Sequence, residues 1–384
     1  MNDVERPEPD CITVNLHPRH TRRLFGHEQA QSEFMDAWRS GRLHHAWLIS
    51  GPRGIGKATM AWRIARFLLT RPQVSAAQES FFQAGSPSRP ASPDRIPDPD
   101  PSHPADRRMT ALSEPDLKLC RRPWDEKIKK FKRFITVDEV RRLQSEFATR
   151  SVTGAWRVAI VDAADDMNEA SANAFLKLLE EPPDHVLFLL VCHQPSRLLP
   201  TVRSRCRTLT CRHLDPDSFA HVMTASGRGE NIGARRELAV LSAGSPGDAI
   251  RLADGNGISA YADLVRLFSA APTLDRRFAL TIAEDFGSGD GSRFDLGLRL
   301  VALLMMRLAR FGACRSDDIV EAAEGEAAMI RKLAPEPEAA RMWAGLAQDL
   351  PPRAEESRRT NLDPTGAILD ILFRMNAVAR RVVT

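Results

Sequence analysis

The sequence contains no long apolar run. Its longest apolar stretches, Val186 to Cys192 and Val301 to Met306, are far shorter than the roughly 20 residues that a helix needs to cross a hydrocarbon layer. This excludes a helical membrane protein. The N-terminal residues Met1 to Asp10 mix acids with two prolines and lack the apolar core of a secretory signal. We therefore expect a cytoplasmic protein that does not bind a membrane.

Cysteine is also scarce and poorly spaced for a structural role. The chain has six cysteines, and no two of them form a CxxC pair. Zinc modules and disulfide frameworks depend on clustered cysteines, so we expect neither, and we predict no metal site. The charge is also not strongly one-sided, since 54 basic and 50 acidic residues leave a net charge of +4. That balance permits contact with nucleic acid but does not require it.

The sequence does contain a regular alternation of apolar runs and helical patterns. Its 384 residues suffice for two or three domains. Short apolar runs at 46–50, 158–161 and 186–192 alternate with amphipathic patterns, as in a parallel sheet that is covered on both faces. After residue 210 only helical patterns remain. Nine prolines fall between 71 and 115, and this composition predicts a mostly disordered insertion.

One glycine-rich motif indicates nucleotide binding. Residues 51–57, Gly-Pro-Arg-Gly-Ile-Gly-Lys, match GxxxxGK and lie between a predicted strand and a predicted helix. Such glycines let successive backbone N–H groups point at phosphate oxygens, while the helix N-terminus favours an anion. A glycine-rich turn without a ligand is the alternative interpretation. The predicted nucleotide-binding residues are Gly51, Pro52, Arg53, Gly54, Ile55, Gly56, Lys57, Ala58, Thr59 and Asp162.

Two groups that ATP hydrolysis needs are missing from this pattern. Ala58 stands where a Ser or Thr hydroxyl would bind magnesium. Thr59 is rotated from that position by about 100° around the helix. Asp162 follows the run at 158–161 and is placed to hold a metal through water, but the next residue is Ala163, not the Glu of many P-loop ATPases. We expect ATP to bind without efficient hydrolysis, and the participation of Mg²⁺ stays open.

Further segments resemble the bacterial AAA+ clamp-loader subunits. They are Gly41 to Leu48, Asn173 to Pro183, and Ser204-Arg205-Cys206. The resemblance covers 24–69 and 134–209, weakens to 253, and is only architectural beyond. It implies an α/β P-loop domain of the AAA+, RecA-like type, then a small helical lid domain and an all-α collar domain that serves oligomerisation. The implied bounds are an extension at 1–23, the P-loop domain at 24–210 with its insertion at 71–118, the lid at 211–255 and the collar at 256–384.

The resemblance also implies a role and a set of partners. Clamp loaders of DNA polymerase III load the sliding clamp onto primed DNA, at replication forks on the nucleoid, as hetero-pentamers that contain delta and ATPase subunits of the gamma/tau type. In this family the arginine at position 205 reaches into a neighbour's ATP site. Gly247 stands where active subunits carry a sensor arginine, and the family's four-cysteine zinc module is absent. The resemblance therefore implies a replication subunit with little or no ATPase activity of its own.

Several alternatives stay open at this point. The intact glycines and Lys57 are also consistent with an autonomous P-loop ATPase, and a scaffold that binds no nucleotide is a third possibility. Arg205 could be an ordinary surface arginine within a basic run from Arg197 to Arg212. The same arginine-rich run and the basic stretch Lys127 to Arg133 are each consistent with a solvated face or with contact to the DNA backbone.

Overall fold

The computed structural model describes residues 8–9, 17–71, 94–148, 156–227, 236–289, 291–314, 319–359 and 363–383. The chain divides into two compact units, one formed by residues 1–226 with 245–247 and the other by 227–244 with 248–384. The expected bounds of three domains therefore stay a prediction. Within the described ranges, no helix has the length and apolar character to span a membrane.

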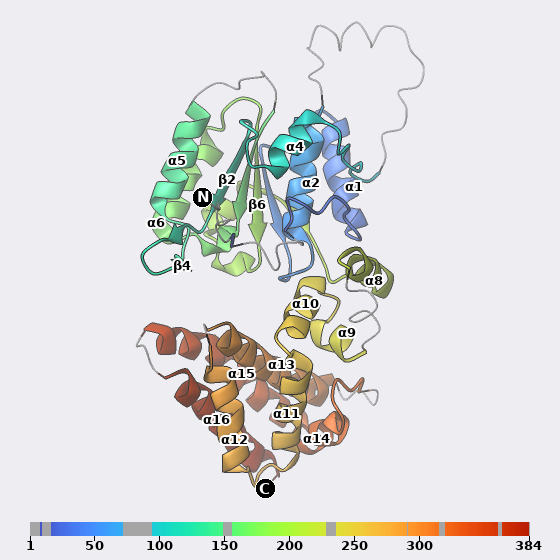
Figure 1. Cartoon of the computed structure of the whole chain (residues 1–384), viewed down its shortest axis with the longest axis vertical. Coiled ribbons are helices and arrows are strands. Elements are labelled where there is room, and N and C mark those ends of the chain that lie inside the picture. Colours follow the sequence, from blue (N-terminus) through green and yellow to red (C-terminus); the bar gives the residue numbers. More distant parts are fainter. Residues whose placement is uncertain are drawn as a thin grey trace, which may run out of the picture. The chain divides into compact units, whose positions relative to one another are not determined.

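The N-terminal unit is built on a five-stranded parallel sheet in the order β2-β5-β6-β1-β7. Helices cover both faces, with α1, α2 and α4 on one and α5 and α6 on the other (Figure 1). The strands are β1 (Ala46–Ser50), β2 (Leu117–Arg121), β5 (Arg157–Asp162), β6 (Val186–Cys192) and β7 (Arg207–Thr210). The helices are α1 (Glu28–Arg39), α2 (Lys57–Leu69), α4 (Pro104–Thr110), α5 (Val137–Ala148), α6 (Glu169–Glu180), α7 (Pro200–Arg203) and α8 (Pro216–Ala225), with 3-10 turns η2 (Ala164–Asp166) and η3 (Pro195–Arg197).

Alternate residues of the strands feed two separate cores. On β1, Trp47 and Ile49 point into a core shared with α1 and α2, while Leu48 points into the core shared with α5 and α6. Every residue of β6 is buried, which explains why its sequence is a continuous apolar run and does not alternate. The predicted P-loop fold, a parallel sheet covered by helices and followed by a helical region, is confirmed.

The predicted disorder of the insertion at 71–118 is wrong over residues 94–118. This segment forms α4 and enters β2, which pairs with β5 from Leu117 opposite Val158. Met109 and Asp106 are fully buried, and the Asp106 carboxylate accepts a 2.6 Å bond from Arg66 Nε of α2. A few buried residues anchor a stretch whose average composition suggests disorder. Residues 72–93, the remainder of the prediction, lie outside the described residues.

A small hairpin leaves the sheet between β2 and α5. It consists of β3 (Trp124–Asp125) and β4 (Lys130–Phe131), which pair antiparallel. Lys132 N donates to Pro123 O at 2.8 Å and closes the base of the hairpin. In Figure 1 its loop extends beside the label β4, below α6.

The C-terminal unit is helical throughout its described residues. Its core includes Tyr261, Phe268, Phe286 and Trp343, all of them fully buried. Glu326 is also fully buried, and its carboxylate accepts hydrogen bonds from the Tyr261 hydroxyl at 2.6 Å and from Arg307 Nε at 2.5 Å. The remaining helices are α9 (Arg236–Ser242), α10 (Pro246–Asp254), α11 (Gly257–Ser269), α12 (Arg276–Gly287), α13 (Ser292–Cys314), α14 (Glu326–Leu333), α15 (Pro337–Arg359) and α16 (Pro364–Val383).

Candidate nucleotide site

The glycine-rich loop connects β1 to α2, as the motif predicts. Gly51, Gly54 and Gly56 have φ values of 150°, 73° and 100°, a region that side chains disfavour. A Cβ atom at Gly51 would lie 2.2 Å from the carbonyl oxygen of Cys211, which immediately follows β7. The wrapped shape of the loop therefore depends on glycine at these positions.

Lys57 lies inside this loop with only 3% of its side chain exposed. Its ammonium donates to Gly51 O at 2.6 Å and to Pro52 O. Burial lowers the pKa of Lys57 to about 8, although the nearby acidic groups, Asp162 and Asp165 among them, act in the opposite direction. A buried cation that uses the loop's own carbonyl groups as acceptors can exchange them for phosphate oxygens.

Three contacts hold the loop from its other side. The His27 ring donates a 2.7 Å hydrogen bond from Nε2 to Ile55 O, and burial lowers the pKa of this histidine. Ser245 Oγ donates to Arg53 O, and Gly247 N donates to Gly54 O, both at 2.9 Å. Sequence reasoning missed His27 and Ser245 because no motif marks them. The sequence drew attention to Gly247 only because a sensor arginine is absent there, and did not predict its contact with the loop.

The metal-binding part of the site is incomplete. Ala58 is the second residue of α2 and packs its methyl group against the core, so no oxygen atom stands there. Thr59 is half-buried on the next position of the helix. Asp162 ends β5, close enough to Lys57 to favour its charged form, and Ala163 beside it is buried. The site thus fits phosphate groups, while only Asp162 of the expected metal-holding groups is in place.

Asp165 has a role that the sequence did not predict. Its buried carboxylate accepts hydrogen bonds from the backbone N–H groups of His193 at 2.9 Å and Gln194 at 3.1 Å. Those residues follow β6, the strand between β5 and β1. Asp165 therefore fixes the chain beside the phosphate loop and is occupied by that task.

Arg205 lies at the amino ends of the parallel strands, whereas the loop lies at their carboxyl ends. All five strands are parallel, and the loop leaves β1 at its carboxyl end, whereas Arg205 comes two residues before β7 begins. Its guanidinium is 40% exposed, donates to Thr201 O at 3.0 Å and pairs at 2.9 Å with Glu180, the last residue of α6. The length of β1, about 16 Å at 3.3 Å per residue, separates the two ends. Arg205 is therefore remote from the loop of its own chain.

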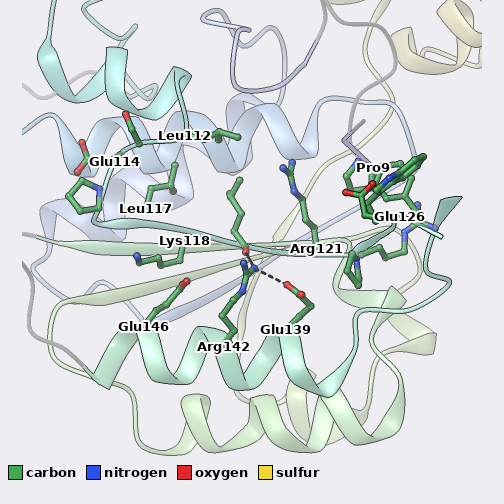
Figure 2. A pocket seen from close by; sticks show the side chains of 17 residues that line it. Pro9, Leu112, Glu114, Leu117, Lys118, Arg121, Glu126, Glu139, Arg142 and Glu146 are labelled. Carbon is green, nitrogen blue, oxygen red and sulfur yellow. Dashed lines mark hydrogen bonds and ion pairs between the residues drawn. The ribbon is translucent and has the colours of Figure 1, made fainter. Parts of the chain in front are cut away.

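No group of three or more His, Cys, Asp or Glu side chains is placed to hold a metal ion in the described part of the chain. A cavity of about 600 Å³ lies away from the loop, along the outer side of β2 (Figure 2). Its charged lining is balanced, with four basic and four acidic side chains. These are Lys118, Arg121, Arg122 and Arg142, and Glu114, Glu126, Glu139 and Glu146.

Comparison with known proteins shows which proteins this chain resembles. Residues 91–215 match the family model described as "DNA polymerase III, delta subunit". The delta prime subunit of Pseudomonas aeruginosa DNA polymerase III is 33% identical over 216 residues, covering 56% of this chain and 57% of the relative. This chain is similar to the delta prime subunits of DNA polymerase III. That of Escherichia coli is 30% identical over 222 residues, covering 57% of this chain and 58% of the relative.

The similarity extends to a second kind of polymerase III subunit. The gamma/tau subunit of Mycobacterium bovis is 27% identical over 244 residues, which is 62% of this chain and 37% of the relative. The resemblance to clamp-loader subunits expected from the sequence is confirmed, and the similar proteins include delta prime subunits. The matched region spans a little over half the length of the delta prime relatives, 57% and 58%. Arg205 and Asp162 both fall inside the residues that match the family model.

Proposed function

We propose that this chain is the delta prime subunit of a DNA polymerase III clamp loader. In this role it assembles in the cytoplasm, on the nucleoid, with delta and gamma/tau-type ATPase subunits in a hetero-pentamer that loads the sliding clamp onto primed DNA. Similarity to delta prime and gamma/tau subunits supports the family of partners. The collar predicted at 256–384 would join the ring, consistent with its helical structure.

The observation that carries the proposal is the placement of Arg205. Arg205 lies at the amino ends of the strands, and its own phosphate loop lies at their carboxyl ends. It can therefore contact a nucleotide only if that nucleotide is bound by another subunit. Its exposed guanidinium is available to such a neighbour after it releases or shares Glu180. A guanidinium beside a γ-phosphate stabilises the charge that develops during transfer, and such arginines raise rates by about 10³ to 10⁵.

The phosphate loop has a different proposed role, which is to hold ATP without hydrolysing it efficiently. Lys57 and the glycines supply the phosphate contacts. The missing hydroxyl at Ala58 and the missing carboxylate at Ala163 remove the groups that would bind magnesium and polarise water. The contacts of Ser245 and Gly247 also tie the loop to the turn that follows α9.

The decisive experiment uses the reconstituted complex with Arg205→Ala. We expect ATP hydrolysis stimulated by DNA and clamp to fall, because the adjacent ATPase site loses its guanidinium. Arg203→Ala is the matched control, since this exposed arginine lies on α7 two residues away. Among the described residues, its guanidinium donates only to Pro195 O. Full stimulated activity in Arg205→Ala, or equal losses in both variants, refutes the assignment.

ATP binding to the isolated chain separates the remaining alternatives. Binding without turnover, with or without magnesium, is expected. A chain that binds no ATP would be a scaffold. Turnover by the isolated chain that Lys57→Ala abolishes would instead indicate an autonomous ATPase, the reading favoured by the intact loop.

A further inference from the structure

The hairpin between β2 and α5 carries a concentrated positive charge. Residues 122–133, here called the basic hairpin, contain six basic and two acidic residues. The side chains of Lys127, Lys129, Lys130 and Lys132 are exposed. None of these four lysines forms an ion pair with a residue that the structure describes. The charge is therefore available to an external anion.

The lysines stand on a well-supported base. The Trp124 and Phe131 rings pack edge to face across the two strands, with centroids 5.0 Å apart. Asp125 Oδ1 accepts from Lys127 N at 3.0 Å, which shapes the loop. Arg122 pairs with Asp166 at 3.2 Å and fastens the hairpin to the turn after β5. Such a base presents the lysines in a fixed arrangement and so lowers the entropy lost on binding.

The tip of the hairpin combines charge with an apolar side chain. Ile128 is 62% exposed between Lys127 and Lys129. Nucleic acid offers the complement, since its phosphates flank apolar sugar and base surfaces, and proteins that bend or unstack DNA often use apolar side chains in this way.

The position of the basic hairpin places it beside the nucleotide site. It follows the carboxyl end of β2, and the phosphate loop follows the carboxyl end of β1, so both lie at the same end of the parallel strands. Three strand spacings, about 14 Å, separate the two strands across the sheet. The cavity along β2 has a lining of balanced charge that includes none of the four lysines (Figure 2). It is therefore a weaker binding site for a polyanion than the basic hairpin.

We infer that the basic hairpin is a DNA-binding element of this chain. Its four lysines contact backbone phosphates irrespective of sequence, and Ile128 lies against the sugars or bases between them. Contacts of this kind release counterions, so they weaken steeply with salt. DNA is preferred over an acidic protein because regularly spaced phosphates match several lysines on one short loop without a matching shape.

The test measures binding of the full-length isolated chain to a labelled primer–template DNA by fluorescence anisotropy over a range of salt. The hairpin variant combines Lys127→Gln, Lys129→Gln, Lys130→Gln and Lys132→Gln. The control removes the same charge from exposed arginines of the C-terminal unit that form no ion pair with a described residue. It combines Arg276→Gln, Arg277→Gln, Arg331→Gln and Arg381→Gln.

We expect the hairpin variant to lose about tenfold or more in affinity. Its salt slope should fall by about 3.6, because each of the four neutralised phosphates contributes about 0.9. The control should keep the wild-type slope, and thermal unfolding should show that both variants fold. An unchanged slope in the hairpin variant, or an equal loss in the control, overturns the proposal. So does a wild-type chain that binds anionic vesicles or an acidic protein but no DNA. This test measures DNA binding by the isolated chain, whereas the test of the proposed function measures ATP hydrolysis by the reconstituted complex, so failure here is distinct from failure of the proposed function.

Discussion

The lowered pKa of Lys57 predicts how nucleotide affinity depends on pH. In the free protein, burial lowers this pKa from 10.5 to about 8. A bound phosphate favours the charged form and raises the pKa again. Above pH 8 the free protein must take up a proton to bind, so the affinity falls about tenfold for each pH unit. Up to pH 10.5 the loss reaches about 300-fold.

The assay is a titration of the isolated chain with a fluorescent ATP analogue from pH 7 to 10. The second ionisation of a phosphate lies near pH 6, so the ligand itself contributes little in this range. Lys57→Met is the control, and its weaker residual binding should not change over the same interval. Circular dichroism at each pH establishes that the protein stays folded.

The same pKa has a consequence for stability. Between pH 8 and 10.5 the unfolded chain holds a proton on Lys57 that the folded chain has lost. Lys57 therefore makes the fold more stable as the pH rises through this window, opposite to its effect on ATP affinity. A wild-type affinity that stays constant to pH 10 would refute the reasoning, because Lys57 would then keep its ordinary pKa or would not contact the phosphates.

Three further predictions concern the packing around the site and are tested by urea unfolding. Gly51→Ala should destabilise the protein by about 2 kcal/mol or more, as typical of steric strain, since its Cβ would meet Cys211 O, and it should abolish ATP binding; wild-type stability would contradict the placement of the loop. Asp106→Leu should cost about 3–5 kcal/mol by leaving the buried Arg66 unpaired, whereas the double variant with Arg66→Met should recover most of the loss. Ser245→Ala should lower the free energy of unfolding by about 1 kcal/mol, because it removes the hydrogen bond to Arg53 O. Ser242→Ala should lower it less, because the Ser242 hydroxyl bonds only within its own helix.

The phosphate loop and Asp162 could be predicted because each is defined by neighbours in the chain. A strand before the glycines and an apolar run before the acid place both at one edge of a parallel sheet. His27 and Ser245 could not be predicted in the same way. Ser245 is 192 residues from the carbonyl group that it binds, and no local pattern marks that contact.

The error over residues 94–118 has a compositional cause. Prolines and acids dominate the stretch, but Asp106 is buried by pairing with Arg66, and Pro104 begins α4 at a position that tolerates proline. The average composition of a segment does not reveal single contacts of this kind. The location of Arg205 across the sheet from the loop likewise required the strand order, since the motif around it specifies only a residue type.

The hairpin follows β2, and among the strands that the structure describes β2 is the outermost of its sheet, with β5 as its one partner. A change of length or charge in residues 126–129 would disturb no strand of the described sheet, because the loop closes on itself through Pro123 and Lys132. The loop can therefore be replaced without altering the sheet. Once the exposed Cys314 is replaced, Lys129→Cys could carry a fluorophore that reports on DNA while the phosphate loop and Arg205 remain intact.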